Sequence, residues 1–217
     1  MSGNPQPGGE SAAAVFDEVG ARYEEVFADI PGQLAALDWL KQRLAPRARV
    51  LDVGSGTGRP TAEVLTRAGF GVTGIDVSGE MVRLAGERVP GAAFEQADVR
   101  TYRPPAGGYD AVCAFFPLLV MDQPDVADSL ARMASWVAPG GSFVMATVPG
   151  DIRLLGIEWM GHEVRVSSLA TEDQLRVLGD AGLEVVHHST ALYRPHGPGA
   201  EPEQHLYVHA HRPLAAA

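Results

Sequence analysis

The sequence predicts an α/β fold: a doubly wound, mostly parallel seven-stranded sheet with an antiparallel C-terminal edge hairpin and an N-terminal helical preamble. Strand-like and helix-like segments alternate with short connections over residues 49–148, which is typical of a parallel sheet covered by helices on both faces. A glycine cluster lies between the first strand and its helix. Near the C-terminus two long strand-like segments follow one another without a helix, which indicates a hairpin.

The composition is that of one soluble globular domain. Of the 217 residues, 46% are hydrophobic and 20% are charged, and the net charge is −10. This acidic balance argues against a surface that binds nucleic acid phosphates. The longest apolar stretch, residues 111–121, contains Pro117 and is much shorter than the roughly 20 residues of a spanning helix, so no membrane segment is predicted. The single cysteine, Cys113, favours a cytoplasmic protein without disulfides.

Apolar residues from 12 to 45 recur at helical spacing, and Pro31 with Gly32 is expected to separate two helices. Residues 1–12 are rich in Gly and Pro, lack the features of a signal peptide and are expected to form a flexible tail. Since no linker is evident, we expect a single domain over 13–213. Its expected parts are a helical lid at 13–45, a ligand-binding core at 49–148, and a substrate lid with the C-terminal strands at 149–213.

The predicted core contains five strands and the helices that connect them. The strands are short apolar runs, predicted at 49–53, 71–76, 93–96, 109–116 and 141–148. The helices are predicted at 59–68, after an N-cap at Ser78, and at 126–137. A turn at Pro139 and Gly140 precedes the fifth strand.

The pattern changes after Gly150. The elements expected there are a strand at 163–168, a helix at 171–181 with Thr171 as its N-cap, and strands at 183–192 and 204–211 with a loop at 195–202 between them. The last two strands supply the predicted edge hairpin.

The glycine cluster has the context of a ligand-binding loop. Residues 51–58 read LDVGSGTG, and they follow a strand and open a helix. Glycines allow positive backbone dihedrals and close approach of a ligand to the main chain. Gly54, Gly56 and Gly58 fall at alternate positions, unlike the G-x-G-x-x-G loop that leaves room for a pyrophosphate. The spacing therefore favours a ligand without phosphates over a dinucleotide.

Acidic residues end the second and third predicted strands. Asp76 lies about 20 residues beyond the loop, where a carboxylate can accept both ribose hydroxyls of an adenosine. Asp98 could accept from an adenine amino group. The alternatives are a helix cap for Asp76 and a solvated loop acid for Asp98. Carboxyl ends of parallel strands meet at one edge, so both acids are expected beside the glycine loop.

Five motifs in this order resemble the class I S-adenosylmethionine-dependent methyltransferase family. They are VLDVGSGTGR at 50–59, GIDVS at 74–78, QADVR at 96–100, YDAV at 109–112 and APGG at 138–141. The resemblance extends over roughly residues 23–148 and continues more weakly into the C-terminal strands. The glycine motif alone is moderately specific, whereas the ordered set is strong.

The resemblance implies S-adenosylmethionine as cofactor and S-adenosylhomocysteine as product, with Asp76 on the ribose and Asp52 facing the amino-acid moiety or orienting the loop. Val77 and Met81 would flank the adenine. The residues implied to contact the cofactor are Tyr23, Asp52, Gly54, Ser55, Gly56, Gly58, Asp76, Val77, Met81, Asp98, Val99 and Phe115. For Tyr23, above the cofactor, and Phe115, near the sulfonium, core packing is the alternative.

The resemblance implies methyl transfer to a small molecule, in which alignment of the reacting atoms supplies most of the catalysis. The apolar segment after YDAV favours an apolar or aromatic metabolite, with Phe116, Trp159 and Met160 lining its pocket. We expect natural-product tailoring, with oxygen favoured over nitrogen or carbon as acceptor. His162, in the expected substrate lid, is the candidate catalytic base, with a structural histidine as the alternative.

No metal site is predicted. His187 and His188 are adjacent in a strand and point to opposite faces, and no Cys or His cluster with zinc spacing accompanies them. His205, His209 and His211 lie in the last strand and are expected on a solvated edge. The expected partner is a small-molecule substrate, not nucleic acid or membrane, and the chain is expected to be a monomer or homodimer.

Two other functions are alternatives to methyl transfer. A short-chain nicotinamide-dependent oxidoreductase needs a Tyr-x-x-x-Lys pair, but the only lysine, Lys41, precedes the glycine loop and has no tyrosine four residues before it. A methyltransferase-like fold used as a cyclase or as a cofactor-binding module would keep the loop and both acids, so the sequence leaves this alternative open.

Overall fold

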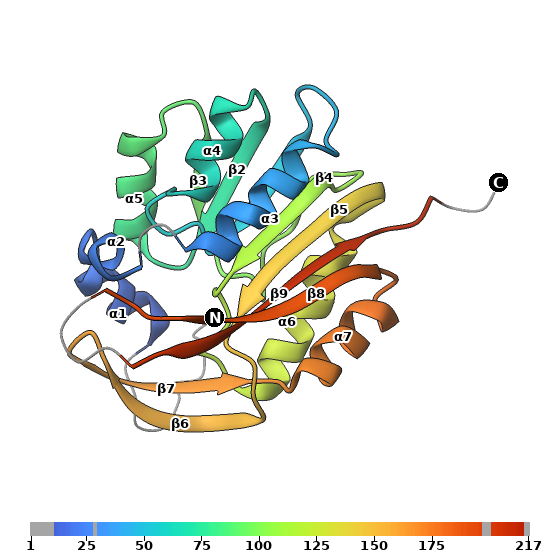
Figure 1. The fold of residues 1–217 in the computed structure, drawn as a ribbon. Helices are drawn as coiled ribbons and strands as arrows, with labels where there is room; N and C mark the ends of the chain where they lie inside the picture. Colours follow the sequence, from blue (N-terminus) through green and yellow to red (C-terminus); the bar gives the residue numbers. More distant parts are fainter. Residues whose placement is uncertain (1–10, 28–29, 197–200, 215–217) are drawn as a thin grey trace.

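The structure of this protein is a computed structural model, and it describes residues 11–27, 30–196 and 201–214. A seven-stranded sheet in the order β3-β2-β1-β4-β5-β9-β8 forms the centre of the molecule (Figure 1). Nearly all of the tail expected at residues 1–12 lies outside the described residues. Among the described residues, no helix has the length and apolar character needed to cross a membrane.

The sheet confirms the predicted fold class. The strands are β1 (Arg49–Val53), β2 (Gly71–Asp76), β3 (Ala93–Gln96), β4 (Tyr109–Phe115), β5 (Val137–Thr147), β8 (Glu184–Tyr193) and β9 (Glu203–His211). The first five pair in parallel, β9 runs antiparallel to β5, and β8 runs antiparallel to β9. The C-terminal hairpin therefore ends the sheet on one side.

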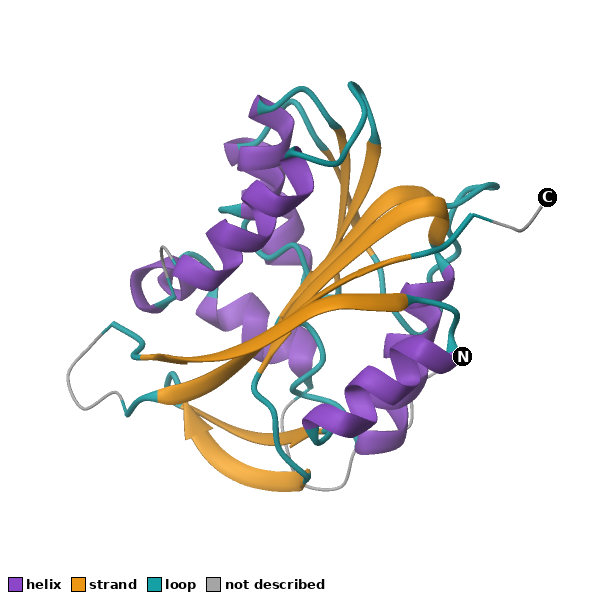
Figure 2. Cartoon of the chain, turned by 45° about the vertical axis from the view of Figure 1, so that its right-hand side comes forward, coloured by secondary structure: helices purple, strands orange, loops and turns teal. Residues whose placement is uncertain are grey.

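Helices cover both faces of the sheet (Figure 2). Buried side chains of α3 (Pro31–Lys41) and α4 (Thr61–Arg67) pack on one face, whereas those of α6 (Gln123–Ser135) and α7 (Thr171–Asp180) pack on the other. The helix α5 (Gly79–Arg88) lies beside β2 and β3. Ser78 caps α5 as predicted, because its hydroxyl accepts from the Met81 amide at 3.0 Å.

The N-terminal region contains three described helices, where the sequence indicated two. The first two are α1 (Ala12–Val19) and α2 (Arg22–Val26), and α3 follows. The break after α1 lies at Gly20, which has φ +49°. Pro31 does not separate helices but begins α3, because a proline at the first helical position loses no intrahelical hydrogen bond.

A second sheet of two strands was only half predicted. The strand β7 (His162–Ser168) matches the expectation, but β6 (Ile152–Trp159) was missed. Most side chains of β6 are exposed or half-buried in no regular alternation, so no strand period was visible. Met160 and Gly161 both have positive φ and close the hairpin between Trp159 and His162. In Figure 1 this hairpin lies beyond the carboxyl ends of β4 and β5.

The starts of α7, α6 and β5 differ from the prediction for reasons that the structure shows. The N-cap of α7 is Ala170, and Thr171 is its first helical residue. Asp122 caps α6, so this helix starts before the apolar period begins. The turn at Pro139 and Gly140 lies inside β5 as a bulge, because the register with β4 shifts between Tyr109 and Ala111.

The last strand is not a solvated edge, which corrects the expectation for two of its histidines. Since β9 lies between β5 and β8, His205 and His209 are buried, whereas His187 and His188 on β8 are exposed. The His209 ring lies 4.8 Å from the Trp39 ring on α3 and 5.4 Å from the His187 ring. Burial, with the charges of His187 and Arg43, lowers the pKa of His209 to about 4.

This depressed pKa predicts an acid-sensitive fold. The unfolded chain binds a proton at His209 near pH 6.5, whereas the folded chain does so only near pH 4. Stability therefore falls as the pH drops through this window, and it is fully present above it. We expect His209 to contribute about 1 to 2 kcal/mol to the loss of unfolding free energy between pH 7 and pH 5.

Urea unfolding at both pH values measures this loss. In His209→Asn the pH-dependent loss should shrink by that amount. The matched control is His188→Asn, which changes an exposed histidine and should leave the loss as in the wild type. Equal losses in His209→Asn and wild type would contradict the prediction.

Candidate functional site

A cavity of about 820 Å³ opens at the carboxyl ends of β1, β2 and β4. Its floor comes from the loops that follow these strands, and its other walls come from α1, α2, the β6–β7 hairpin and the start of β9. This is the edge of a parallel sheet where ligands bind in open α/β folds. Among the described residues, no group of His, Cys, Asp and Glu side chains could hold a metal ion.

The glycine loop is fixed to the neighbouring strand. The amides of Gly54 and Ser55 both donate to the Ile75 carbonyl, at 2.8 and 3.0 Å. Gly54 has φ +67°, and a Cβ there would lie 2.5 Å from the Pro117 Cβ, so this position requires glycine. Gly56 has φ +50° and no atom within 4 Å of the place of a Cβ. The main chain at Gly56 is therefore open to the cavity.

Asp76 connects the end of β2 to this loop. Its Oδ2 accepts from the Gly56 amide at 2.8 Å, and its Oδ1 accepts from the Ser78 amide at 2.9 Å. Burial raises the pKa of Asp76, and the backbone hydrogen bonds oppose this effect. A carboxylate oxygen can accept more than one hydrogen bond, so both oxygens keep capacity for a ligand in the cavity.

Two polar atoms at the end of β1 are buried without a hydrogen-bond partner among the described residues: Asp52 Oδ2 and Ser55 Oγ. Both residues line the cavity. Burial, with the charge of Asp76 as a second cause, raises the pKa of Asp52 to about 8. Unpaired buried polar atoms are costly, so their position at a cavity wall fits a ligand that carries hydrogen-bond donors or a positive charge.

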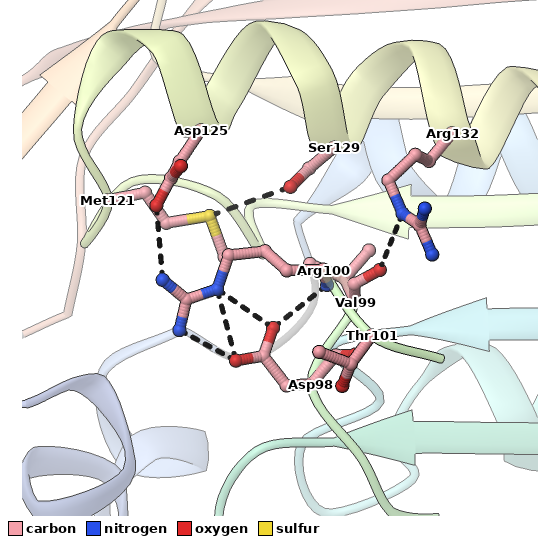
Figure 3. A network of polar contacts seen from close by, with 8 residues as sticks. All are labelled: Asp98, Val99, Arg100, Thr101, Met121, Asp125, Ser129 and Arg132. Atoms are coloured by element: carbon pink, nitrogen blue, oxygen red, sulfur yellow. Dashed lines mark hydrogen bonds and ion pairs between the residues drawn. The ribbon is translucent and has the colours of Figure 1, made fainter. Parts of the chain in front are cut away.

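Asp98 is held by an arginine rather than left open. Its carboxylate binds the Arg100 guanidinium at 2.6 to 3.1 Å and accepts from the Arg100 amide, and Arg100 also reaches Asp125 on α6 at 3.0 Å (Figure 3). Burial by itself would raise the pKa of Asp98, but the Arg100 contacts outweigh it and lower the pKa. A ligand donor would have to use the remaining lone pairs of this carboxylate.

Aromatic rings from three elements meet over the cavity. Tyr23 on α2 stacks on Phe27 at 5.1 Å, Phe27 stacks on Trp159 of β6 at 6.0 Å, and Phe16 of α1 meets Trp159 edge-on at 5.4 Å. Burial, and then the negative charges of Glu203 and Asp76, raises the pKa of Tyr23, so its hydroxyl stays protonated. This aromatic cluster joins the helices α1 and α2 to the β6–β7 hairpin.

Two acidic side chains attach the same helices to the core. Asp17 on α1 accepts from the Ser78 hydroxyl at 2.6 Å and from the Glu80 amide at 3.1 Å. Glu24 on α2 accepts from the Thr57 hydroxyl in the glycine loop and from Arg88 Nη1 at 2.6 Å. The helices α1 and α2 are thereby anchored on the glycine loop and on α5.

Most of the site residues predicted from the sequence border this cavity. They are Tyr23, Asp52, Gly54, Ser55, Gly56, Asp76, Val77, Met81, Asp98, Val99, Phe115, Phe116 and Trp159. Their roles in ligand binding stay predictions, but the structure brings their side chains or main chain to the walls of one cavity.

Three of the predicted residues do not border the cavity. A Cβ at Gly58 would meet Val89 and Phe94, so this glycine serves packing against α5 and β3. Met160 lies in the β6–β7 turn and packs against buried side chains under α1. His162 is buried at the start of β7 but is not on the cavity wall, so the geometry gives no support to its role as a base.

Glu203 and His205 border the cavity and were not predicted as site residues. They were missed because β9 was expected to be an edge strand, on which alternate residues face solvent. An acid and a histidine two residues apart on one strand face were the available signal.

Comparisons with known proteins agree with this architecture. Residues 50–141 match a family model described as a methyltransferase domain. These residues contain β1 to β4, α4 to α6 and the glycine loop.

Curated relatives are also methyltransferases. The chain is 31% identical over 142 residues to a demethylmenaquinone methyltransferase of Renibacterium salmoninarum, an alignment that covers 63% of this chain and 58% of the relative. It is 29% identical over 187 residues to 27-O-demethylrifamycin SV methyltransferase of Amycolatopsis mediterranei, covering 78% and 64%. The chain thus spans less than two thirds of the length of either relative.

Solved structures share the fold. The [4+2]-cyclase SpnF superposes with a TM-score of 0.74 at 19% sequence identity, covering 99% of this chain and all of that one. Other similar structures are methyltransferases solved with S-adenosylmethionine or S-adenosylhomocysteine. At such identities the likeness establishes the fold.

The anchoring of α2 by Glu24 yields a test. In Glu24→Gln the charged contacts to Arg88 and Thr57 weaken, which should cost of the order of 1 kcal/mol and raise hydrogen exchange of the amides in residues 12–26 about fivefold. Hydrogen exchange with mass spectrometry measures this. Glu25→Gln, an exposed neighbour on the same helix, is the control and should leave exchange unchanged. Identical exchange in the two variants would show that the Glu24 contacts do not hold α2.

Proposed function

We propose that this chain, whose residues 50–141 match a family model described as a methyltransferase domain, is a class I S-adenosylmethionine-dependent methyltransferase. In this proposal it binds S-adenosylmethionine in the cavity and transfers the methyl group to a small molecule. The observation that carries this proposal is the pair of buried polar atoms at the end of β1. There Asp52 Oδ2 and Ser55 Oγ, which have no hydrogen-bond partner in the described part of the chain, belong to residues that line the cavity with the open main chain of Gly56. A ligand with a charged amino group fits these atoms.

The residues around the cavity suit each part of this cofactor. Asp76 has free acceptor capacity for the ribose hydroxyls, and Asp52 and Ser55 offer acceptors to the amino-acid moiety. Val77 and Met81 would flank the adenine. The proposed contacts to the adenine edge are Val99 and the lone pairs of Asp98 that Arg100 does not use.

The remaining wall residues fit the reactive end of the cofactor. We place Phe115 near the sulfonium, where an aromatic face stabilises a cation, and Tyr23 above it. The bound cofactor supplies an electrophilic methyl group. The chain aligns an acceptor with that methyl group, and the anchored helices α1 and α2 exclude water.

The acceptor is proposed to be an apolar or aromatic metabolite. Phe116 and Trp159 line the cavity. Apolar side chains of the segment after β4 and of β6 line it as well: Leu119, Val120, Ile152, Leu154 and Ile157. The similarity to a relative named for demethylrifamycin supports an oxygen acceptor on a natural product.

A second candidate function is cyclisation without methyl transfer. It is favoured by the likeness to the [4+2]-cyclase over nearly the whole chain. The two functions differ in their product, because methyl transfer releases S-adenosylhomocysteine whereas a cyclase leaves its cofactor unchanged.

The cofactor site is tested by calorimetric titration with S-adenosylhomocysteine. We expect micromolar affinity for the wild type and at least a tenfold loss in Asp76→Ala, because charge-assisted hydrogen bonds to the ribose disappear. Asp128→Ala, on the exposed side of α6, is the control and should bind as the wild type does. Circular dichroism checks that each variant is folded. Without binding by the wild type, the proposed function has to be abandoned.

The raised pKa of Asp52 predicts that cofactor binding releases a proton. With a pKa of about 8, Asp52 is protonated in about nine molecules of ten at pH 7. A bound ammonium group favours the ionised carboxylate and lowers this pKa, so close to one proton is released. The observed binding enthalpy at pH 7 should therefore vary with the ionisation enthalpy of the buffer. In Asp52→Asn this dependence should vanish, and its persistence there would assign the proton to another group.

A further inference from the structure

We propose that Glu203 accepts the proton of the methyl acceptor, and that His205 and Tyr207 hold the Glu203 carboxylate in position. This inference rests on the proposed function, and it names a residue of the acceptor half of the same cavity. The three residues alternate along β9 and therefore share one face of the sheet.

The hydrogen bonds of this trio have only one consistent direction when the imidazole is neutral. His205 Nε2 lies 2.7 Å from Glu203 Oε1, and His205 Nδ1 lies 3.2 Å from the Tyr207 hydroxyl oxygen. A carboxylate only accepts, so Nε2–H donates to Glu203. The Nδ1 atom is then an acceptor, and the Tyr207 hydroxyl donates to it. The chain of donors runs from Tyr207 through His205 to Glu203.

His205 cannot itself take the proton of the methyl acceptor. It is only 1% exposed, and its ring packs 4.4 Å from the Phe116 ring and stacks on Tyr193 at 5.1 Å. Tyr207 is fixed as well, since its ring lies against Gly32 so closely that a Cβ there would overlap it. Both nitrogen atoms of His205 are used within the trio, so it acts through Glu203.

Glu203 is the end of this series of hydrogen bonds that reaches the cavity. Its side chain is 34% exposed and lines the cavity. The contact with His205 uses one carboxylate oxygen and leaves the other for a ligand. A carboxylate that receives a donor from the protein on one oxygen is oriented for a second donor on the other.

Glu203 lies in the part of the cavity that we assign to the methyl acceptor, not in the part assigned to the cofactor. Leu206 pairs with Thr147, so the start of β9 lies beyond the carboxyl end of β5, next to Phe116. The glycine loop and Asp76 follow β1 and β2, on the other side of β4. Tyr23 lines the same cavity as Glu203 and Asp76.

The proposed step balances for a hydroxyl acceptor. A lone pair of the acceptor oxygen forms the new bond to the methyl carbon. The bond between this carbon and sulfur breaks, and its electron pair stays on sulfur, so the sulfonium charge is lost. The hydroxyl proton passes to the free oxygen of Glu203, so the carboxylate charge is lost as well. The acceptor class is therefore a hydroxyl group on an apolar or aromatic molecule, with a phenol as the simplest member.

The first test compares phenol with anisole on protein saturated with S-adenosylhomocysteine. The two probes have similar shape, but only phenol can donate a hydrogen bond. We expect phenol to bind about tenfold more tightly than anisole to the wild type, and about equally in Glu203→Leu. Glu201→Leu, an exposed glutamate just before β9, is the matched control and should keep the preference.

The outcomes separate the two proposals. If the wild type binds S-adenosylhomocysteine but does not prefer phenol, the role of Glu203 is overturned while the cofactor site stands. If Glu203→Leu loses affinity for S-adenosylhomocysteine as Asp76→Ala does, Glu203 belongs to the cofactor site and the inference is wrong. If the wild type does not bind S-adenosylhomocysteine, both proposals fail together.

The positioning role of His205 has a spectroscopic signature. In protein labelled with ¹⁵N-histidine, we expect the His205 Nε2 to carry the proton that Glu203 accepts, with the resonances assigned by their loss in His205→Asn. Phenol should shift the Nε2 resonance of the wild type, whereas anisole should not. Tyr207→Phe should retain this shift but weaken the preference for phenol about twofold to threefold. An Nε2 resonance that does not respond to phenol would reduce the trio to a packing role and overturn the inference.

Discussion

The site depends on one connection between two neighbouring strands. The Ile75 carbonyl receives two amides of the glycine loop, and Asp76, the next residue, receives the amide of Gly56. The end of β2 thereby fixes a loop that leaves β1 with positive φ angles at three glycines. Because the loop is held from the strand side, its other side stays open toward the cavity, which Asp52 and Ser55 also line.

The helices α1 and α2 are held by the same short region. Asp17 binds the residue that caps α5, and Glu24 binds a threonine inside the glycine loop. Ser78 lies two residues after Asp76, and Thr57 follows Gly56, whose amide binds Asp76, so a distortion of the loop would also loosen α1 and α2. The order of α1 and α2 and the shape of the loop are therefore coupled through hydrogen bonds.

The parts of the structure that follow from local patterns could be predicted from the sequence. The strands β1 and β2 are mostly apolar runs, the first followed by the glycine loop and the second ending in an acid, and β4 is an apolar run. Ser78 is a helix cap of an ordinary kind. The missed parts depend on contacts that sequence spacing does not show. Residues of β6 have little burial on either face, and the burial of His205 depends on β9 lying inside the sheet rather than at its edge. For the same reason Glu203 was not predicted as a site residue, whereas His162 was predicted from its place beyond the fifth strand, in the expected substrate lid.

The separate β6–β7 sheet has a consequence for how such a protein can diversify. It contacts α6, the aromatic cluster of α1 and α2, and the segment after β4, where the Ser167 amide donates to the Leu119 carbonyl, and it carries the exposed Leu155. The residues proposed to hold the cofactor lie in other segments of the chain. Exchanging this hairpin between homologous chains would therefore alter the range of accepted molecules while the cofactor half keeps its own hydrogen bonds, which makes the hairpin an interchangeable module.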